Sequence, residues 1–299
     1  MIKALLRPAM IFIPFALGAI LPQAHRLTFM IPWFLVCMLY MVCLQLNLKE
    51  LKPEPAHFKL LLLNLVMGIT PYLLLKYLYP ANEALAMAAF FAGITPTATA
   101  APVVMRFLNG KVEFVVTAFV INNLGISLLL PLLLLWVTGR EDAWSFMSLV
   151  CRTLLIIMLL PLILAMITRK IHPAAQMWPK KTGNFTFLMW SSMLFIMAAS
   201  ASEFIRNNPE IHPAILLVIA GQSAVICFFN FFIGYFCTKN LRRECSQSLG
   251  QKNTTFTMYL ALTYANPLVA MGPIAYILWH NVWNAVQMFI YDRKHPDNP

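Results

Sequence analysis

Ten apolar runs, each close to the length of a membrane span, follow one another along the 299-residue chain. A helix needs about 20 mostly apolar residues to cross about 30 Å of hydrocarbon. Only 11% of the residues are charged, whereas a soluble domain has about 25% and needs them to cover its surface. The sequence therefore predicts an all-α membrane protein with ten transmembrane helices, at about residues 6–22, 28–47, 58–78, 83–107, 112–138, 146–168, 183–204, 212–238, 245–264 and 267–290.

Lysine and arginine are distributed unevenly between alternate loops of this arrangement. Sixteen of the 22 lie on the side of the N-terminus and five on the opposite side. Because cytoplasmic loops carry the excess of Lys and Arg, both termini are expected in the cytoplasm. Topology thus accounts for the net charge of +11, and the expected partner is the lipid bilayer rather than nucleic acid. The sequence does not indicate an oligomeric state.

The fourth and ninth runs are irregular. Pro96 and Pro102 cannot both lie inside a regular helix, since each removes a hydrogen bond and clashes with the preceding turn. The stretch from Ser246 to Thr255 is polar at what should be membrane depth, where irregular backbone requires cover by protein or water. We therefore expect broken fourth and ninth helices in two inverted five-helix repeats, residues 1–138 and 139–299, with a binding site at the breaks.

The polar side chains within the runs are mostly neutral. No run holds an interior carboxylate, which argues against a proton pump or a cation site built on carboxylates. Nucleophile triads, phosphate loops and metal-ligand spacings are also missing from the sequence, so we expect neither an enzyme nor a cofactor. Asn122, Asn123 and His280 also have a simpler interpretation as packing contacts between helices. The candidate substrate and crossover residues are Thr95, Thr97, Thr99, Asn122, Asn123, Gln251, Lys252, Asn253, Thr254 and His280.

Lys252 is a cation within the polar stretch of the ninth run. A charge at the bilayer centre costs about 2.5–3.5 kcal/mol on insertion scales, so such a residue is a functional candidate by default. Two interpretations remain open from the residues alone. The ninth helix could start later and leave Lys252 in the cytoplasmic loop. Alternatively, Lys252 is buried and its charge is offset by a substrate anion or by the C-terminal end of a half-helix.

Motifs at residues 93–104, 108–117, 250–255, 261–264 and 277–284 resemble those of the bile acid:sodium symporter family. The resemblance implies a bacterial inner-membrane carrier that moves a small organic anion with sodium by alternating access. It also implies a panel domain from helices 1, 2, 6 and 7 and a core domain from helices 3–5 and 8–10. The broken helices would cross at the centre of the core, with substrate bound beside the crossing.

The chain departs from the family pattern where the resemblance places sodium. Ala101 and Pro102 stand where the family has Ser-Asn, and the family's acidic and Gln ligands become Ser248 and Lys252. The hydroxyls that the family has in the fifth helix fall near Val115 and Phe119. Hard cations prefer several oxygen ligands. We therefore hypothesise that Lys252 takes the place of sodium, so that transport is uniport, exchange or proton-coupled. The degenerate sodium positions are Ala101, Pro102, Thr117, Ser248, Gln251 and Lys252.

Two other functions fit the same sequence. A related carrier for a different solute, of the arsenite or auxin type, would share the crossover. A membrane sensor or scaffold that has lost transport would also have lost its sodium ligands. Substrate assays separate the first alternative from an organic anion carrier, and failure of every carboxylate to change thermal stability would favour the second.

Overall fold

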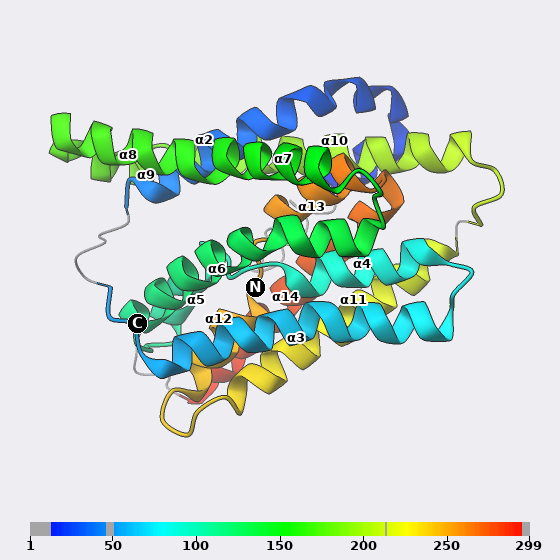
Figure 1. Cartoon of the computed structure of the whole chain (residues 1–299). Coiled ribbons are helices and arrows are strands. Elements are labelled where there is room, and N and C mark those ends of the chain that lie inside the picture. Colours follow the sequence, from blue (N-terminus) through cyan, green and yellow to red (C-terminus); the bar gives the residue numbers. More distant parts are fainter. Residues whose placement is uncertain (1–12, 46–50, 213, 295–299) are drawn as a thin grey trace. The chain divides into compact units, whose positions relative to one another are not determined.

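The computed structural model describes residues 13–45, 51–212 and 214–294, apart from the side chains of Lys180, Asp292 and Lys294 (Figure 1). Within these residues the fold is all-helical, as predicted, and one isolated bridge is the only β-type pairing. In the first half, residues 13–20 are helical and are followed by η1 (Pro22–Met30), α2 (Ile31–Cys43), α3 (Pro55–Leu78), α4 (Glu83–Ile94), α5 (Ala101–Phe107) and α6 (Val112–Thr138). In the second half come α7 (Ala143–Leu154), the π-helical η3 (Leu155–Leu159), α8 (Leu160–Ile171), η4 (Pro173–Met177), α9 (Trp178–Lys181), α10 (Gly183–Asn207), α11 (Ile215–Tyr235), α12 (Arg242–Gly250), α13 (Thr254–Tyr264) and α14 (Pro267–Lys294).

Six helical stretches of the described chain are long and apolar enough to cross a membrane. They are Pro22–Cys43, Pro55–Leu78, Val112–Thr138, Ala143–Ile171, Gly183–Asn207 and Ile215–Tyr235. The expected fourth and ninth spans are each divided into two shorter helices, and α14 is not among the six. An integral membrane protein is therefore supported, while the count of ten spans stays a prediction.

Proline positions explain the first break. Pro96 has no N–H to continue α4, and the residue before a proline is pushed towards extended backbone. Thr95 accordingly adopts φ −48° and ψ 128°. Pro102 lies in the first turn of α5, where its missing N–H removes no helical hydrogen bond. The chain thus leaves helix at Ile94 and re-enters it at Ala101.

The second break follows Gly250. The chain turns to extended backbone at Gln251, with ψ 102°, and α13 begins three residues later at Thr254. A Cβ atom on Gly250 would lie 2.3 Å from the ring of Phe231, so only glycine fits this close approach of α12 to α11.

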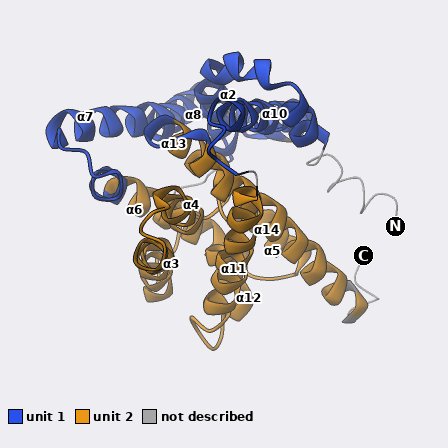
Figure 2. Cartoon of the chain, turned by 90° about the vertical axis from the view of Figure 1, so that its right-hand side faces the viewer, with its two compact units in different colours: residues 1–48, 129–212, 263–267 blue, residues 49–128, 213–262, 268–299 orange. Residues whose placement is uncertain are grey.

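The chain divides into two compact units (Figure 2). One comprises residues 1–48, 129–212 and 263–267, and the other comprises residues 49–128, 213–262 and 268–299. The second unit contains both breaks and all the residues of the candidate site, so the following sections concern this unit alone.

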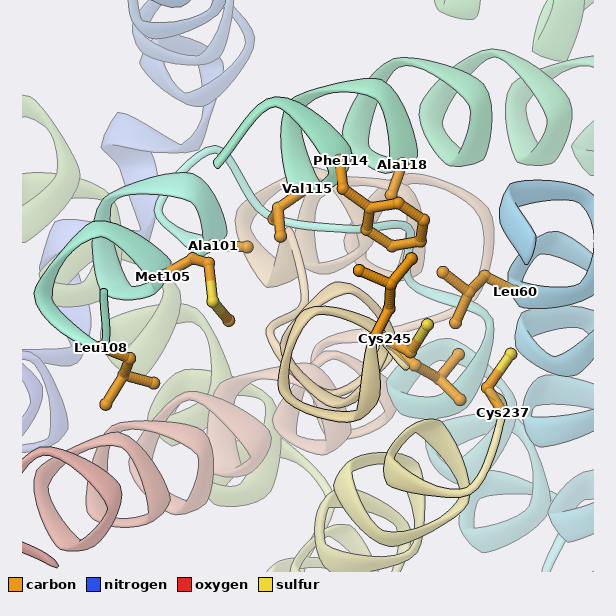
Figure 3. Packing of buried hydrophobic residues seen from close by; sticks show 11 residues of the cluster. Leu60, Ala101, Met105, Leu108, Phe114, Val115, Ala118, Cys237 and Cys245 are labelled. Atoms are coloured by element: carbon orange, nitrogen blue, oxygen red, sulfur yellow. The ribbon is translucent and has the colours of Figure 1, made fainter. Parts of the chain in front are cut away.

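An apolar cluster fills part of the second unit (Figure 3). Its buried members are Leu60, Ala101, Met105, Leu108, Phe114, Val115, Ala118, Cys237, Leu241, Cys245 and Leu249. These side chains come from α3, α5, α6 and α12 and from the segments after α5 and α11. Burial of a large aliphatic side chain contributes about 1.5–3 kcal/mol, so the cluster anchors the two half-helices α5 and α12 by packing.

Candidate functional site

The two breaks are joined by a short antiparallel bridge between Thr97 and Lys252. Ala98 N donates to the Gln251 carbonyl at 2.8 Å, and Asn253 N donates to the Pro96 carbonyl at 2.8 Å. Each break therefore supplies the backbone partners that the other lost when its helix ended. This exchange satisfies polar groups that would otherwise be unpaired at membrane depth.

Side chains reinforce the bridge around Thr97. The Thr97 hydroxyl donates to the Ser248 carbonyl at 2.6 Å and accepts from Asn122 Nδ2 at 2.8 Å. Asn123 Nδ2 donates to the Thr97 carbonyl at 2.9 Å. On the other side of the break, the hydroxyl oxygens of Thr95 and Thr257 lie 2.7 Å apart. The structure thus brings together Thr95, Thr97, Asn122 and Asn123 at the strand-like contact.

Lys252 is buried at the bridge, with 1% of its surface exposed. Its ammonium donates to Asn64 Oδ1 and, at 3.1 Å, to the Gly93 carbonyl. Asn64 Nδ2 in turn donates to the Ile94 carbonyl at 3.1 Å. Lys252 therefore lies at the C-terminal end of α4, where a helix dipole favours a positive charge. The alternative in which Lys252 sits in a solvated loop is wrong.

The close contact of α3 and α4 makes this arrangement possible. A Cβ atom on Gly93 would lie 2.0 Å from the Met67 carbonyl oxygen, so glycine is required where α4 passes α3. The same contact brings Asn64 of α3 alongside the final turn of α4. The ammonium of Lys252 thus bonds with α3 and α4 at once.

A second polar contact lies on the other side of Gln251. Gln251 Oε1 accepts from Asn284 Nδ2 and, at 3.4 Å, from Gln247 Nε2. Gln247 Nε2 also donates to Asn284 Oδ1 at 3.1 Å, and the Tyr276 hydroxyl donates to the Gly250 carbonyl at 2.8 Å. These bonds attach the end of α12 to α14.

The side chains of the other candidate residues lie apart from the hydrogen bonds described above. Thr99 is half-buried two residues beyond the bridge, and His280 packs edge-on against Tyr276 with ring centroids 5.7 Å apart. Thr254 is the buried first residue of α13, and Asn253 adjoins it within the break. The Thr117 hydroxyl donates to Glu113 of its own helix at 2.9 Å and accepts from Lys52 N, so it does not join the bridge.

The positions where the family resemblance expects sodium ligands hold few side-chain oxygens. Ala101 and Val115 belong to the apolar cluster and offer no side-chain oxygen (Figure 3). At position 252 the lysine ammonium donates hydrogen bonds to Asn64 Oδ1 and to the Gly93 carbonyl. Ser248 keeps a hydroxyl, buried and without a partner in the described chain. At these positions the chain therefore supplies fewer side-chain oxygens than the family pattern has.

The sequence did not identify several residues that complete the network. Asn64, Gln247, Thr257 and Asn284 were not among the candidates, although they bond with residues that were. Asn64 was recognisable as an isolated amide within the apolar run from Leu60 to Met67. No feature of the sequence indicated the role of the Gly93 carbonyl, because every residue has a backbone carbonyl.

Comparison with protein families gives a match. The model of the Sodium Bile acid symporter family matches residues 32–208, more than half of the chain. The matched residues include the first break and end before the second, so Lys252 lies outside them. No curated protein matches the chain significantly.

Proposed function

The chain belongs to the sodium bile acid symporter family, and from this premise we propose that it is a secondary carrier that moves a small organic anion without sodium. In this proposal the ammonium of Lys252 supplies the positive charge that a coupling ion would otherwise bring to the crossing of the broken helices. The observation that carries it is the burial of Lys252 against Asn64 and the end of α4.

The charge at Lys252 favours an anionic substrate. Both hydrogen bonds that the ammonium donates end on neutral oxygens, and no carboxylate of the described chain forms an ion pair with it. Nearby, the first turn of α13 presents the positive end of a helix dipole. Asn253 Nδ2, at the entry to this helix, is a buried donor without a partner in the described residues. Together these groups suit a carboxylate or sulfonate.

The architecture proposed for transport has ten spans in two inverted repeats, residues 1–138 and 139–299. Support comes from the fourth and ninth segments, which break at corresponding places in the two halves. A core of α3–α6 and α11–α14 would alternate its access against a panel formed by the remaining helices. We place the protein in a bacterial inner membrane with both termini in the cytoplasm, as its charge distribution suggests.

Uptake into proteoliposomes tests the proposal. A thermal-shift screen of taurocholate and a panel of small carboxylates and sulfonates first identifies a ligand, and its labelled form then serves as the probe. Uptake in sodium buffer should equal uptake in choline buffer within about twofold. A steep sodium dependence would overturn the proposal.

Variants of two lysines complete this test. Lys252→Gln should abolish uptake of the probe, whereas Lys76→Gln is a matched control at an exposed lysine on α3 and should not. Unchanged uptake by Lys252→Gln would contradict the role given to the ammonium. If no probe changes thermal stability or is taken up, the transport-deficient sensor or scaffold is the better description.

A further inference from the structure

A ladder of polar side chains runs between α12 and α14. We define this polar ladder as Arg243 and Gln247 of α12 and Gln251 of the break after it, with Asn284, Gln287 and Tyr291 of α14. Gln251 and Gln247 bond with Asn284, and the guanidinium carbon of Arg243 lies 5.8 Å from the ring centroid of Tyr291. Gln287 lies on the same face of α14, three residues after Asn284 and four before Tyr291.

The ladder connects an exposed end with a buried end. Arg243 is exposed at the start of α12 and also donates to the Leu108 carbonyl at 2.9 Å. Gln251, at the other end, directly precedes Lys252. Gly250, the last residue of α12, lies seven positions after Arg243, which corresponds to about 10 Å along the helix axis, and Lys252 follows two residues later. The ladder thus leads from solvent to the break, where Gln251 adjoins Lys252 in the chain, while the Lys252 ammonium lies against α3 and α4.

Oxygen atoms along the ladder lack protein partners. Gln247 Oε1 and Gln287 Oε1 are buried and accept no hydrogen bond from the described residues, and Gln247 is 0% exposed. The same face of α14 adds His280 Nδ1 as a further buried unpaired atom. Each unsatisfied group costs about 1–3 kcal/mol, and buried polar groups of this kind are commonly satisfied by ordered water. A chain of water molecules along the ladder would satisfy them.

The surroundings of Lys252 contain few titratable groups. The Cys227 thiol on α11 interacts electrostatically with the ammonium, and the Tyr276 hydroxyl on α14 interacts with this thiol. His280 lies beyond Tyr276. Asn64 of α3 and the Gly93 carbonyl of α4 are neutral, as are Asn122 and Asn123 of α6 at the bridge. Lys252 is therefore the group best placed to exchange a proton here.

We propose that the polar ladder is a hydrated proton path and that the proton carried on Lys252 is the coupling ion of this carrier. The inference rests on the proposed function and specifies its coupling. While an anion is bound, its charge keeps Lys252 as –NH₃⁺. After the anion leaves, Lys252 releases one proton to the ladder water and becomes –NH₂, and it takes up one proton before the next anion binds. One monovalent anion and one proton move together, and no net charge crosses the membrane.

Cysteine accessibility tests the path without any substrate. In protein whose six cysteines are replaced by alanine or serine, Gln247→Cys and Gln287→Cys are treated with methanethiosulfonate ethylammonium, a small water-borne reagent. Ala275→Cys, a buried apolar position of α14, is the matched control. Both ladder positions should react at least about tenfold faster than position 275. Equal rates at all three positions would show a dry contact and overturn the proposal.

Proton flux tests the coupling. Proteoliposomes that contain a pH dye are given the probe identified by the uptake screen, in sodium-free buffer. Uptake should acidify the lumen by about one proton per anion and should increase when the lumen is made alkaline. The double variant Gln247→Leu/Gln287→Leu should slow both the uptake of the probe and the acidification of the lumen by about tenfold or more. Gln222→Met, which changes an amide of α11 outside the ladder, should stay within about twofold of the unaltered protein.

The outcomes separate the two proposals. Sodium-independent uptake without acidification overturns the proton coupling and leaves the carrier function standing. Sodium-dependent uptake overturns the function proposed above. If no probe is taken up, the accessibility rates at positions 247 and 287 still decide whether the ladder is hydrated, and a dry ladder overturns the path.

Discussion

The bridge between the breaks and the apolar cluster beside it hold the same helices by different physical means. α12 contributes to both: Ser248 supplies a carbonyl to the bridge, as does Gln251 just after the helix, whereas Cys245 and Leu249 pack into the cluster. Hydrogen bonds at the bridge are few and directional, so the loss of one partner leaves another group unpaired. Packing in the cluster is shared among many side chains and tolerates changes that conserve volume. The bridge should therefore determine transport, and the cluster should determine stability.

Among the changes at the bridge and the cluster, Lys252→Met should cause the largest loss of uptake. The substitution removes the charge and leaves Asn64 Oδ1 and the Gly93 carbonyl without a donor, so we expect uptake to fall by about 100-fold or more, equivalent to about 2.7 kcal/mol. Uptake by the double variant Asn64→Leu/Lys252→Met should be equally low. Thermal unfolding in detergent should nevertheless show the double variant to be more stable than Lys252→Met by about 1–2 kcal/mol, because replacing both partners leaves fewer unpaired groups. Equal stability of the two variants would mean that the hydrogen bond between Lys252 and Asn64 contributes little to the free energy of unfolding.

Thr97→Val tests the directional bonds alone. The side chain keeps its shape but loses the donor to Ser248 and the acceptor for Asn122, and we expect uptake to fall by about tenfold and the free energy of unfolding by about 2 kcal/mol. Thr117→Val is the control, since its hydroxyl mainly bonds with its own helix at Glu113. If both valine variants behave alike, the bridge has no special role.

Leu249→Ala tests the cluster from the same helix. Removing a fully buried leucine side chain should lower the free energy of unfolding by about 3 kcal/mol. Uptake by the protein that remains folded should change by less than about threefold, because the bridge is intact. Thermal unfolding and uptake per folded molecule are the two measurements. A loss of uptake as large as that of Thr97→Val would show that the apolar cluster affects transport as strongly as the bridge does.

Val115→Thr has the smallest expected effect. The change restores a hydroxyl in α6 near a position where the family resemblance places sodium ligands, but this hydroxyl can bond with the carbonyl four residues earlier. We expect a loss of stability of about 1 kcal/mol and no sodium dependence of uptake while Lys252 is present. If sodium stimulates uptake by this variant, the valine at position 115, and not Lys252, accounts for the absence of sodium coupling.

The helical fold and both breaks could be predicted from the sequence because their causes are local. Apolar runs specify helices, and Pro96 and Pro102, six residues apart, each remove a backbone donor and disfavour a regular fourth helix. The partners of Lys252 could not be predicted in the same way. Asn64 lies 188 residues away in the sequence, and Gly93 acts through a carbonyl that every residue has. Only the three-dimensional contact of α3 and α4 shows why a lysine is accommodated there.

The same long separation has a consequence for how the chain is made. A ribosome makes α3 and α4 before it reaches Lys252, so the helices whose oxygens receive the ammonium are synthesised first. A half-helix that ends in a cation is poorly retained by lipid alone. Its entry therefore depends on the earlier helices having already come together. The order of synthesis thus matches the order in which the parts of this site become able to stabilise one another.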